Sequence, residues 1–276
     1  MTAVIAPGVL ADALRRHERS VRVERAVVFG GIVALGVSVL LFWQFALGSI
    51  INLRYVSTPV DVARSLLALA ETGDLLQNAG VTMTEATAGY LIGVTVGLVG
   101  AFLLLTTRRG YEVLEPYVLA FYSVPKIALA PLFIMWFGLG PSPKVILAAL
   151  MVFLIVFVNT VAGVRAVDRG LVDVVRVLGA RRGQLLRVVF LPAAAPAIMA
   201  AVRVTFARAM VGTVLAELIA STEGLGYVIV RASRQFDVAT VFAGVVVIAA
   251  LVMTVNVAMR AVERRVFPWA SRPVHA

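Results

Sequence analysis

The sequence predicts an all-α integral membrane protein that crosses the bilayer six times. Hydrophobic residues make up 61% of the 276 residues, charged residues make up 14%, and the mean hydropathy is +0.97. Soluble domains carry about one quarter charged residues, so an ordinary soluble fold is excluded. Apolar runs long enough to cross a bilayer recur along the chain, and arginines gather in alternate connecting segments.

The net charge of +10 would indicate a nucleic-acid partner in a soluble chain. Arginines that hold loops in the cytoplasm explain the charge better here, and the sequence has no DNA-binding motif, so no nucleic-acid partner is expected. The chain has no cysteine and only two histidines, His17 and His275, which lie near opposite ends. We therefore expect no disulfide and no metal site.

The chain begins with an arginine-rich segment, residues 1–26, which we expect to be a cytoplasmic tail. The apolar run that follows, at 27–51, is too long for a secretory signal peptide and lacks a convincing small-residue cleavage site. We interpret this run as the first spanning helix. Residues 52–78 are mixed and polar, and within them residues 59–69 have the pattern of a short amphipathic helix on the outer surface.

Five further apolar runs complete a predicted six-helix membrane domain at residues 27–265. They cover residues 79–106, 116–138, 142–164, 192–219 and 238–262. If the N-terminus is cytoplasmic, most arginines between the spans fall on the cytoplasmic side: Arg108, Arg109, Arg165, Arg169, Arg176, Arg181, Arg182, Arg187, Arg260, Arg264 and Arg265. The outer side keeps Arg54, Arg64, Lys144, Arg231 and Arg234. The positive-inside rule therefore places both termini in the cytoplasm, including the tail 266–276.

One cytoplasmic loop, residues 165–192, is basic and amphipathic, which anchoring in a membrane does not require. From Asp173 it reads DVVRVLGARRGQLLRVVFLP. Apolar residues at helical spacing before and after Gly179 predict two short helices joined by a turn that glycine makes easily. The alternative is an ordinary basic loop. A helix-turn-helix projection that contacts a soluble partner is the interpretation that accounts for the apolar residues.

Two spans carry residues that shape helix packing. Gly89, Gly93 and Gly97 repeat every four residues, which puts them on one helix face and lets a neighbouring backbone approach closely. Pro125 and Pro131 each remove a backbone donor, so we expect the third span to kink or break. Carbonyls freed at membrane depth are tolerated where they face protein or water, so this span is a candidate pore wall.

Three basic residues within the spans are candidates for the solute path: Lys126, Arg203 and Arg208. Counted from the inner surface at about 1.5 Å per residue, Arg203 lies ~16 Å deep, near mid-bilayer, and Arg208 lies ~24 Å deep. Their separation of five residues puts the two arginines on different helix faces. Two alternatives stay open. Arg203 could pair with a buried acid such as Glu85 or bond freed carbonyls, and Arg208 could reach the outer surface or pair with Glu217.

The loop resembles the EAA loop of ABC importer permeases, in which Glu-Ala-Ala is followed by three residues, a glycine, nine residues, an aliphatic residue, any residue and Leu-Pro. The residues that match this spacing are Gly179, Val189, Leu191 and Pro192. The opening triplet here is Asp173, Val174 and Val175. It keeps the acid and the apolar face but has bulkier valine where alanine is usual.

Three further stretches resemble one branch of these permeases, which is associated with nitrate, taurine, alkanesulfonates and related small organic compounds. They read GYLIGVTVG, SVPKIALAPLFIMWFGLGPSPKV and AELIASTEGLGYVIV, and with the loop they span most of residues 80–265. The start of the second stretch, Val124-Pro125-Lys126, also occurs in relatives linked to pyrimidine or riboflavin-type precursors.

The resemblance implies a type I ABC importer transmembrane fold, with five core helices and a peripheral first helix, in a bacterial plasma (inner) membrane. It implies alternating access by two permease copies, expected as a homodimer, with two cytoplasmic ABC ATPase subunits and an extracytoplasmic substrate-binding protein. The loop would dock on the ATPase with Arg181 and Arg182 at its rim. Because the sequence has no GxxxxGK[ST] loop, the partner would bind ATP and Mg, and we expect no cofactor and no catalytic residue in this chain.

Two other classes of protein could also have a chain of this composition. A stand-alone ion-coupled secondary transporter would show an inverted repeat and an acidic coupling site at mid-membrane, and a membrane acyl or prenyl transferase would show paired acids, a histidine base or a nucleophile. The sequence offers none of these in suitable surroundings, so we expect a transport subunit and not an enzyme. Basic residues at depth favour an anionic solute such as nitrate, a sulfonate or a carboxylate.

Overall fold

The described part of the chain is helical. The computed structural model describes residues 7–45, 56–105 and 110–266, and within them it has no strand. The all-α class expected from the sequence is therefore confirmed. The chain divides into two units, residues 1–64 and 65–276.

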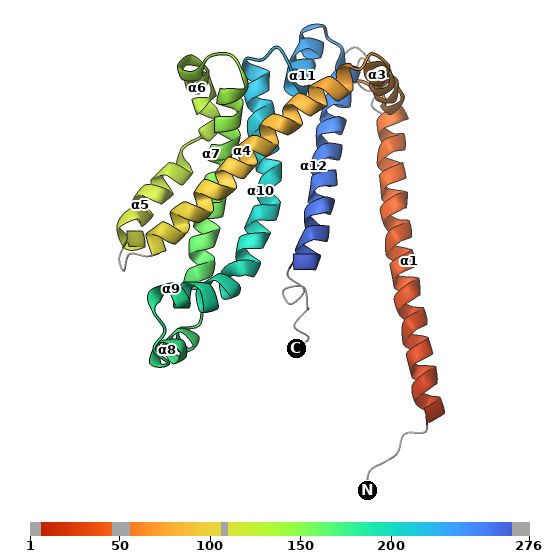
Figure 1. Ribbon diagram of the computed structural model, residues 1–276. Helices are drawn as coiled ribbons and strands as arrows, with labels where there is room; N and C mark the ends of the chain where they lie inside the picture. The colour runs from red at the N-terminus through yellow and green to blue at the C-terminus, as the bar shows by residue number, and fades with distance from the viewer. Residues whose placement is uncertain (1–6, 46–55, 106–109, 267–276) are drawn as a thin grey trace. The chain divides into compact units, whose positions relative to one another are not determined.

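The first unit is built on one long helix, α1, Pro7–Phe45 (Figure 1). Its apolar part, Val27–Phe45, is long enough to cross a membrane, and the rest of the expected first span lies outside the described residues. The expected amphipathic helix is α3, Pro59–Glu71, which begins in this unit. Thr58 caps α3, because its hydroxyl accepts a hydrogen bond from the Asp61 N–H at 3.2 Å and donates one to the Asp61 carboxylate at 2.6 Å.

The second unit holds long helices joined by short ones (Figure 1). In chain order these are α4 Asp74–Leu105, α5 Gly110–Ser123, η1 Lys126–Leu129, α6 Ala130–Phe137, α7 Pro141–Arg165, α8 Arg169–Val177, α9 Arg182–Leu185, η2 Leu186–Phe190, α10 Leu191–Ile219, α11 Leu225–Arg234 and α12 Val238–Val266. The short helices α8 and α11 lie at opposite ends of the long ones. The two ends of this unit are therefore called the α8 end and the α11 end.

The core of the second unit lies where α4, α7 and α10 pack together, and α11 and α12 pack against α10. Tyr90 of α4 and Phe206 of α10 meet edge to face there, with ring centroids 5.5 Å apart. The Tyr90 hydroxyl donates a hydrogen bond to the Val202 carbonyl oxygen at 3.1 Å. This bond satisfies the polar end of the tyrosine, so the aromatic pair can be buried.

Three glycines bring α4 and α7 into close contact: Gly89, Gly93 and Gly97. A Cβ atom at Gly93 would lie 2.6 Å from the carbonyl oxygen of Ala149, and one at Gly97 would lie 2.9 Å from that of Phe153. The contact between α4 and α7 therefore leaves no room for a side chain at these positions of α4, and the close approach repeats every four residues along both helices. It is called the α4–α7 seam below.

Five helices among the described residues are long and apolar enough to cross a membrane, and there are six if one bent pair counts as a single span. The expected third span, 116–138, is this bent pair. Val113–Ser123 and Lys126–Phe137 meet at an angle of 78°. Pro125 lies at the break, and Pro131 lies in the first turn of α6, where its missing N–H is not needed.

Candidate functional site

The segment between α7 and α10 forms a helix-turn-helix projection at the α8 end (Figure 1). Asp168 precedes α8, and its carboxylate accepts a hydrogen bond from the Gly170 N–H at 2.8 Å. After α8 the chain turns at Gly179, which has a φ of 84° and donates its N–H to the Arg176 carbonyl oxygen at 3.0 Å. Residues with a Cβ atom are strained in this left-handed conformation, so glycine fits the turn.

The two arms of the projection are held together by apolar packing. Val172 of α8 is buried against Leu185 and Val189, which lie on the returning arm. The start of that arm is capped, because the Arg181 N–H donates to the Gln184 side-chain oxygen at 2.8 Å. The returning arm passes through the π-helical turn η2 directly into α10, so the projection is continuous with a long helix.

The outward face of α8 is apolar and exposed. Its residues, called the α8 face, are Leu171, Val174, Val177 and Leu178, with exposed fractions of 55%, 61%, 87% and 79%. Asp173 and Arg176 form an exposed ion pair at 3.3 Å on the same helix. An exposed apolar patch with charged residues at its rim is typical of a surface that binds another protein.

The other residues of the expected coupling loop differ in how far they are buried. Val175 is half-buried and packs against the cluster that joins the two arms. Arg181, Leu191 and Pro192 are exposed, with Leu191 and Pro192 in the first turn of α10. The side chain of Arg182 lies outside what the structure describes.

Lys126 lies at the break between α5 and α6. Its ammonium donates hydrogen bonds to the carbonyl oxygens of Tyr122 at 2.8 Å and Val124 at 3.4 Å, and lies 5.0 Å from the centroid of the Tyr122 ring. The last carbonyls of a helix have no partner within it, so Lys126 supplies donors to the end of α5. Its role in the solute path stays a prediction.

Arg203 pairs with an acid, as one of the open alternatives had it, but the acid is Glu263 of α12 and not Glu85. Its guanidinium lies 2.7 Å from the Glu263 carboxylate. Glu263 is the last residue of the apolar stretch Val238–Glu263, so Arg203 pairs with the end of that stretch. Counting residues along α10 located Arg203 on its own helix but gave no information about which residues of α12 lie beside it.

Arg208 is exposed on α10, and no acidic side chain pairs with it in the described part of the chain. The alternative pairing with Glu217 is not formed, because Glu217 is engaged elsewhere. The neighbours of Arg208 on α10, Ala207 and Val211, line a groove of about 740 Å³ between α10 and α12. Apolar side chains line most of this groove.

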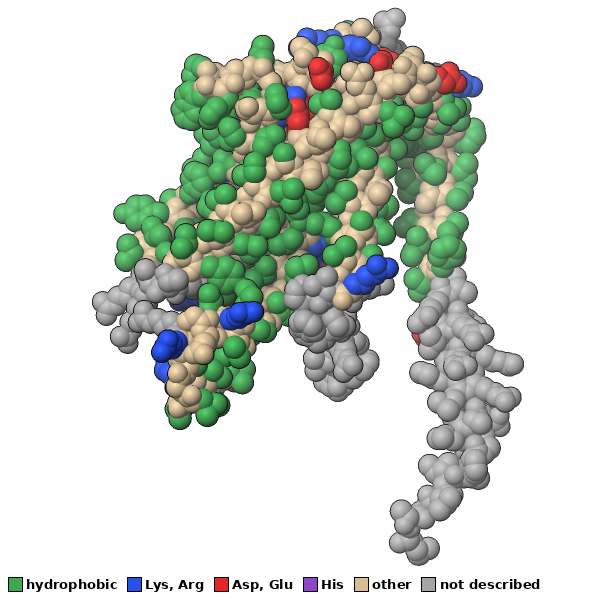
Figure 2. Space-filling view, in the orientation of Figure 1, with side chains coloured by type: hydrophobic (Ala, Val, Ile, Leu, Met, Phe, Trp, Pro, Cys, Tyr) green, Lys and Arg blue, Asp and Glu red, His purple; other side chains and the backbone are tan. Residues whose placement is uncertain are grey.

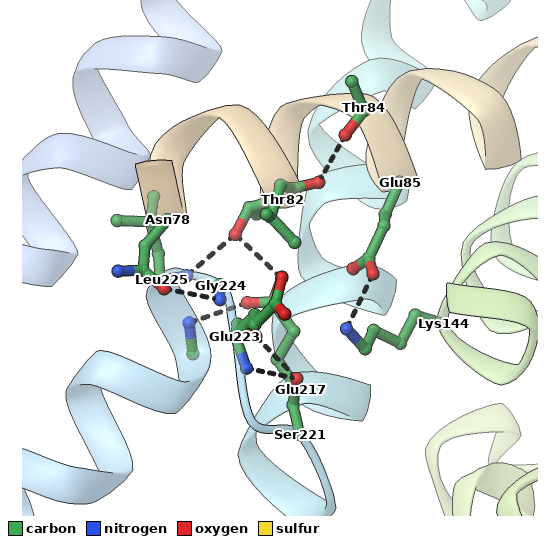
Figure 3. A network of polar contacts seen from close by, with 12 residues as sticks. Asn78, Thr82, Thr84, Glu85, Lys144, Glu217, Ser221, Glu223, Gly224 and Leu225 are labelled. Atoms are coloured by element: carbon green, nitrogen blue, oxygen red, sulfur yellow. Dashed lines mark hydrogen bonds and ion pairs between the residues drawn. The ribbon is translucent and has the colours of Figure 1, made fainter. Parts of the chain in front are cut away.

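A buried polar cluster at the α11 end was missed by sequence reasoning (Figure 3). Lys144, which was expected in an outer loop, lies in the first turn of α7, is 4% exposed and donates a hydrogen bond to Glu85 of α4 at 2.6 Å. Glu217 of α10 is 1% exposed and accepts hydrogen bonds from the Thr82 hydroxyl at 2.8 Å and the Gly226 N–H at 2.7 Å. One feature of the sequence could have revealed this cluster: Lys144 lies inside the expected span 142–164, where a lysine needs a partner.

The distribution of side chains on the second unit suits a bilayer (Figure 2). Hydrophobic side chains cover the long helices between the two ends. Arg and Lys side chains are visible at both the α8 end and the α11 end, and Asp and Glu side chains are visible at the α11 end. Charged groups are costly at membrane depth, so an apolar band bounded by charges matches a chain that crosses a membrane.

The chain also matches known proteins. Residues 89–268 match the family described as "Binding-protein-dependent transport system inner membrane component". The chain belongs to this family. It is a permease subunit of a binding-protein-dependent ABC importer, a multi-pass membrane protein whose family implies an ATPase and a binding protein as partners.

Three relatives show how the permease compares with its family. It is 33% identical over 232 residues to the putative aliphatic sulfonates transport permease protein SsuC of Bacillus subtilis, covering 84% of each chain. It is 32% identical over 247 residues to the taurine transport system permease protein TauC of Escherichia coli, covering 86% of this chain and 88% of that one. It is 33% identical over 231 residues to the riboflavin transport system permease protein RibX of Chloroflexus aurantiacus, covering 83% and 86%.

Solved importer structures share the fold of the permease. A chain from an amino acid ABC transporter crystallised with histidines matches with a TM-score of 0.58 and 22% identity, over 73% of this chain and 98% of that one. A chain of the MetNI methionine ABC transporter in an inward-facing conformation matches with a TM-score of 0.57 and 20% identity, over 73% and 96%. The expected type I importer fold is therefore confirmed.

Proposed function

We propose that this permease subunit moves a small anion, such as nitrate, taurine or another sulfonate, into a bacterial cytoplasm. An extracytoplasmic binding protein delivers the solute, and ATP hydrolysis by a separate subunit drives alternating access. The relatives named for aliphatic sulfonates and taurine support this class of solute. A basic side chain exposed within a long apolar helix, Arg208, supports a negative charge on the solute.

The observation that carries the coupling mechanism is the exposed α8 face. A bundle of membrane helices gains nothing from an apolar patch at its tip unless a protein covers it. We infer that the ATPase covers it, with Asp173, Arg181 and Arg182 supplying charge around the patch. Since α8 follows α7 and the returning arm continues into α10, an ATPase that moves the projection would move two long helices.

The assembly and its orientation follow from the same interpretation. Two copies of the chain form a homodimer, with one ATPase subunit bound to each, and the ATPase subunits bind ATP and Mg. The α8 end lies in the cytoplasm together with both chain termini, because the arginines of the projection obey the positive-inside rule. The α11 end then faces the binding protein.

The residues proposed for the solute path differ in what surrounds them. Arg208 is the first candidate, because it is exposed beside the groove between α10 and α12. Lys126 is the second, because its ammonium is bound to backbone oxygens that an anion would have to replace. Arg203 is already neutralised by Glu263, so we expect it to act on the path through that pair.

An alternative solute is a pyrimidine or riboflavin-type precursor. The relative named for riboflavin transport, at 33% identity, favours this reading, as does the start of the stretch at Val124-Pro125-Lys126. Such a solute is larger and need not be an anion, so the two readings predict different effects of removing the charge of Arg208.

The test is uptake into proteoliposomes that contain the permease with its ATPase and binding protein. We expect ATP-dependent uptake of labelled taurine, another sulfonate or nitrate, and no uptake of riboflavin. Arg208→Gln should reduce anion uptake about tenfold or more, whereas Arg208→Lys should keep most of it. Uptake of riboflavin alone would support the alternative, and uptake by the permease alone without ATP would contradict the importer mechanism.

A further inference from the structure

The N-terminus of α11 is capped by side chains from other helices (Figure 3). The residue before α11, Gly224, has no side chain to cap the helix. Instead, its N–H donates to the Asn78 side-chain oxygen at 2.8 Å, and the Leu225 N–H donates to the Thr82 hydroxyl at 2.8 Å. The first N–H groups of a helix have no partner within it, so α11 depends on α4 for these two bonds.

Glu217 of α10 completes the cap. One of its carboxylate oxygens accepts a hydrogen bond from the Gly226 N–H at 2.7 Å, and the other accepts one from the Thr82 hydroxyl at 2.8 Å. Thr82 and Glu217 are 0% and 1% exposed, so water does not replace these bonds. A negative charge at a helix N-terminus is also favoured by the helix dipole. We call Asn78, Thr82 and Glu217 the α11 cap.

The α11 cap leaves no space for side chains at the start of α11. Gly224 has a φ of 102°, which residues with a Cβ atom rarely adopt. A Cβ atom at Gly226 would lie 2.8 Å from the Val214 carbonyl oxygen and 2.6 Å from the Glu217 Cβ atom. The backbone of α11 therefore lies directly on α10, and the fit is specific to this arrangement.

The helices that hold α11 are themselves tied together. Glu85 lies one turn after Thr82 on α4 and binds Lys144 of α7, with both side chains less than 10% exposed. The α4–α7 seam continues this contact along the two helices. Since α7 and α10 are the helices joined by the α8 projection, a connected set of contacts runs from the α8 end to α11.

We propose that Thr82 and Glu217 are positioning residues that make α11 move with α4 and α10 as one block during each transport cycle. If α11 separated from α4, buried N–H groups and a buried carboxylate would lose their partners, and such losses are costly. Motion of the projection would therefore reach the α11 end without opening the α11 cap. This inference rests on the proposed function only in assuming a transport cycle driven through the projection.

Hydrogen exchange at the start of α11 tests the proposal directly. The amides of Gly224, Leu225 and Gly226 can be followed by mass spectrometry in the permease–ATPase complex, first without nucleotide and then trapped with ATP and vanadate. We expect slow exchange in both states. Thr82→Val removes both hydrogen bonds of the hydroxyl and should speed exchange about fivefold or more in both states. Protection that is lost in one state of the unmodified complex would overturn the proposal, because the cap would then open.

A matched control is available two residues away on the same helix. The Thr84 hydroxyl bonds only to the Gly80 and Val81 carbonyl oxygens of its own helix, so Thr84→Val should leave exchange in α11 unchanged. Equal effects of Thr82→Val and Thr84→Val would show that the loss of a hydroxyl from α4 acts generally, and would overturn the specific role of the cap.

Coupling gives a second readout that a purely structural role would not move. With Thr82→Val the complex should still hydrolyse ATP, but the solute moved per ATP should fall severalfold, and Thr82→Ser should restore the ratio because it keeps the hydroxyl. An unchanged ratio in Thr82→Val would contradict the proposal. Absence of any transport by the unmodified complex would instead contradict the proposed function, while the exchange measurement would still report on the cap.

Discussion

The guanidinium of Arg203 on α10 lies 2.7 Å from the carboxylate of Glu263 on α12. The two side chains are 32% and 24% exposed, so water screens this ion pair only in part. The pair adds a polar contact to the apolar packing between α10 and α12 and lies at the end of the α12 apolar stretch. Helix α12 is thus fixed to α10 at this end by charge.

Removing the cation of this pair should affect transport more than assembly. Arg203→Ala leaves Glu263 partly buried without its partner, and we expect the free energy of unfolding to fall by about 1–2 kcal/mol, with a larger loss of uptake. Thermal unfolding in detergent and uptake in proteoliposomes measure the two effects. The exchanged pair, Arg203→Glu with Glu263→Arg, should recover most of the stability. If the exchanged pair were as unstable as Arg203→Ala, the ion pair would not be the cause of the stability lost in Arg203→Ala.

The α4–α7 seam should not tolerate a side chain. Gly93→Val would place a Cβ atom 2.6 Å from the Ala149 carbonyl oxygen, and backbone cannot move aside as a flexible side chain does. We expect a loss of about 1–3 kcal/mol or failure to fold, seen as a lower Tm and an aggregated fraction in size-exclusion chromatography. Gly80→Val is the matched control, since nothing lies within 4 Å of its Cβ position on the same helix. Equal losses in both variants would mean that helix propensity, not the seam, is responsible.

The features that sequence reasoning predicted are local ones. Hydropathy and helical spacing depend on neighbours along the chain, and they predicted the long apolar helices and the two arms of the projection around Gly179. Two prolines predicted an interruption in the third span, but the 78° angle depends on what the two pieces pack against. The α4–α7 seam was predicted only in part, because the glycine repeat identifies the packing face of α4 but not the helix that packs against it.

The features that sequence reasoning missed depend on distant residues. Glu85 and Lys144 are 59 residues apart, and Thr82 and Glu217 are 135 apart, so no local pattern relates them. For the same reason the sequence could suggest an acidic partner for Arg203, with Glu85 as an example, but could not identify Glu263. Depth along one helix gives no information about its neighbours, and only the packing of α4, α7, α10 and α12 brings these partners together.

The turn after α8 should require glycine for docking of the projection on the ATPase, and not for insertion of the permease into the membrane. Gly179 has a φ of 84°, and a residue with a Cβ atom costs roughly 1–2 kcal/mol there, so Gly179→Val should reorient the returning arm. We expect normal membrane insertion and a loss of ATPase association of about tenfold or more, measured by co-purification. Gly183→Ala is the control, because its Cβ position is open and its backbone is helical. Normal co-purification of Gly179→Val would count against the docking role of the projection.

The buried pair of Lys144 and Glu85 should be more sensitive to the loss of one partner than to the loss of both. Lys144→Met leaves the Glu85 carboxylate buried without a counter-ion, and breaking a buried pair in this way typically costs about 3–5 kcal/mol. Lys144→Met combined with Glu85→Gln removes both charges, so we expect the double variant to be more stable than Lys144→Met alone. The measurement is the Tm of each purified variant in the same detergent.

An exposed ion pair provides the comparison for this prediction. Arg64 and Asp61 lie 3.4 Å apart with side chains 75% and 47% exposed, and Arg64→Met should change the free energy of unfolding by less than about 0.5 kcal/mol. Each of Lys144→Met and Arg64→Met removes one cation. The difference between their losses of stability therefore measures the effect of burial and not of losing a cation as such. If Lys144→Met were as stable as Arg64→Met, the charges at the α11 end would have to be hydrated. The contacts of Glu85 would then not hold α4 against α7.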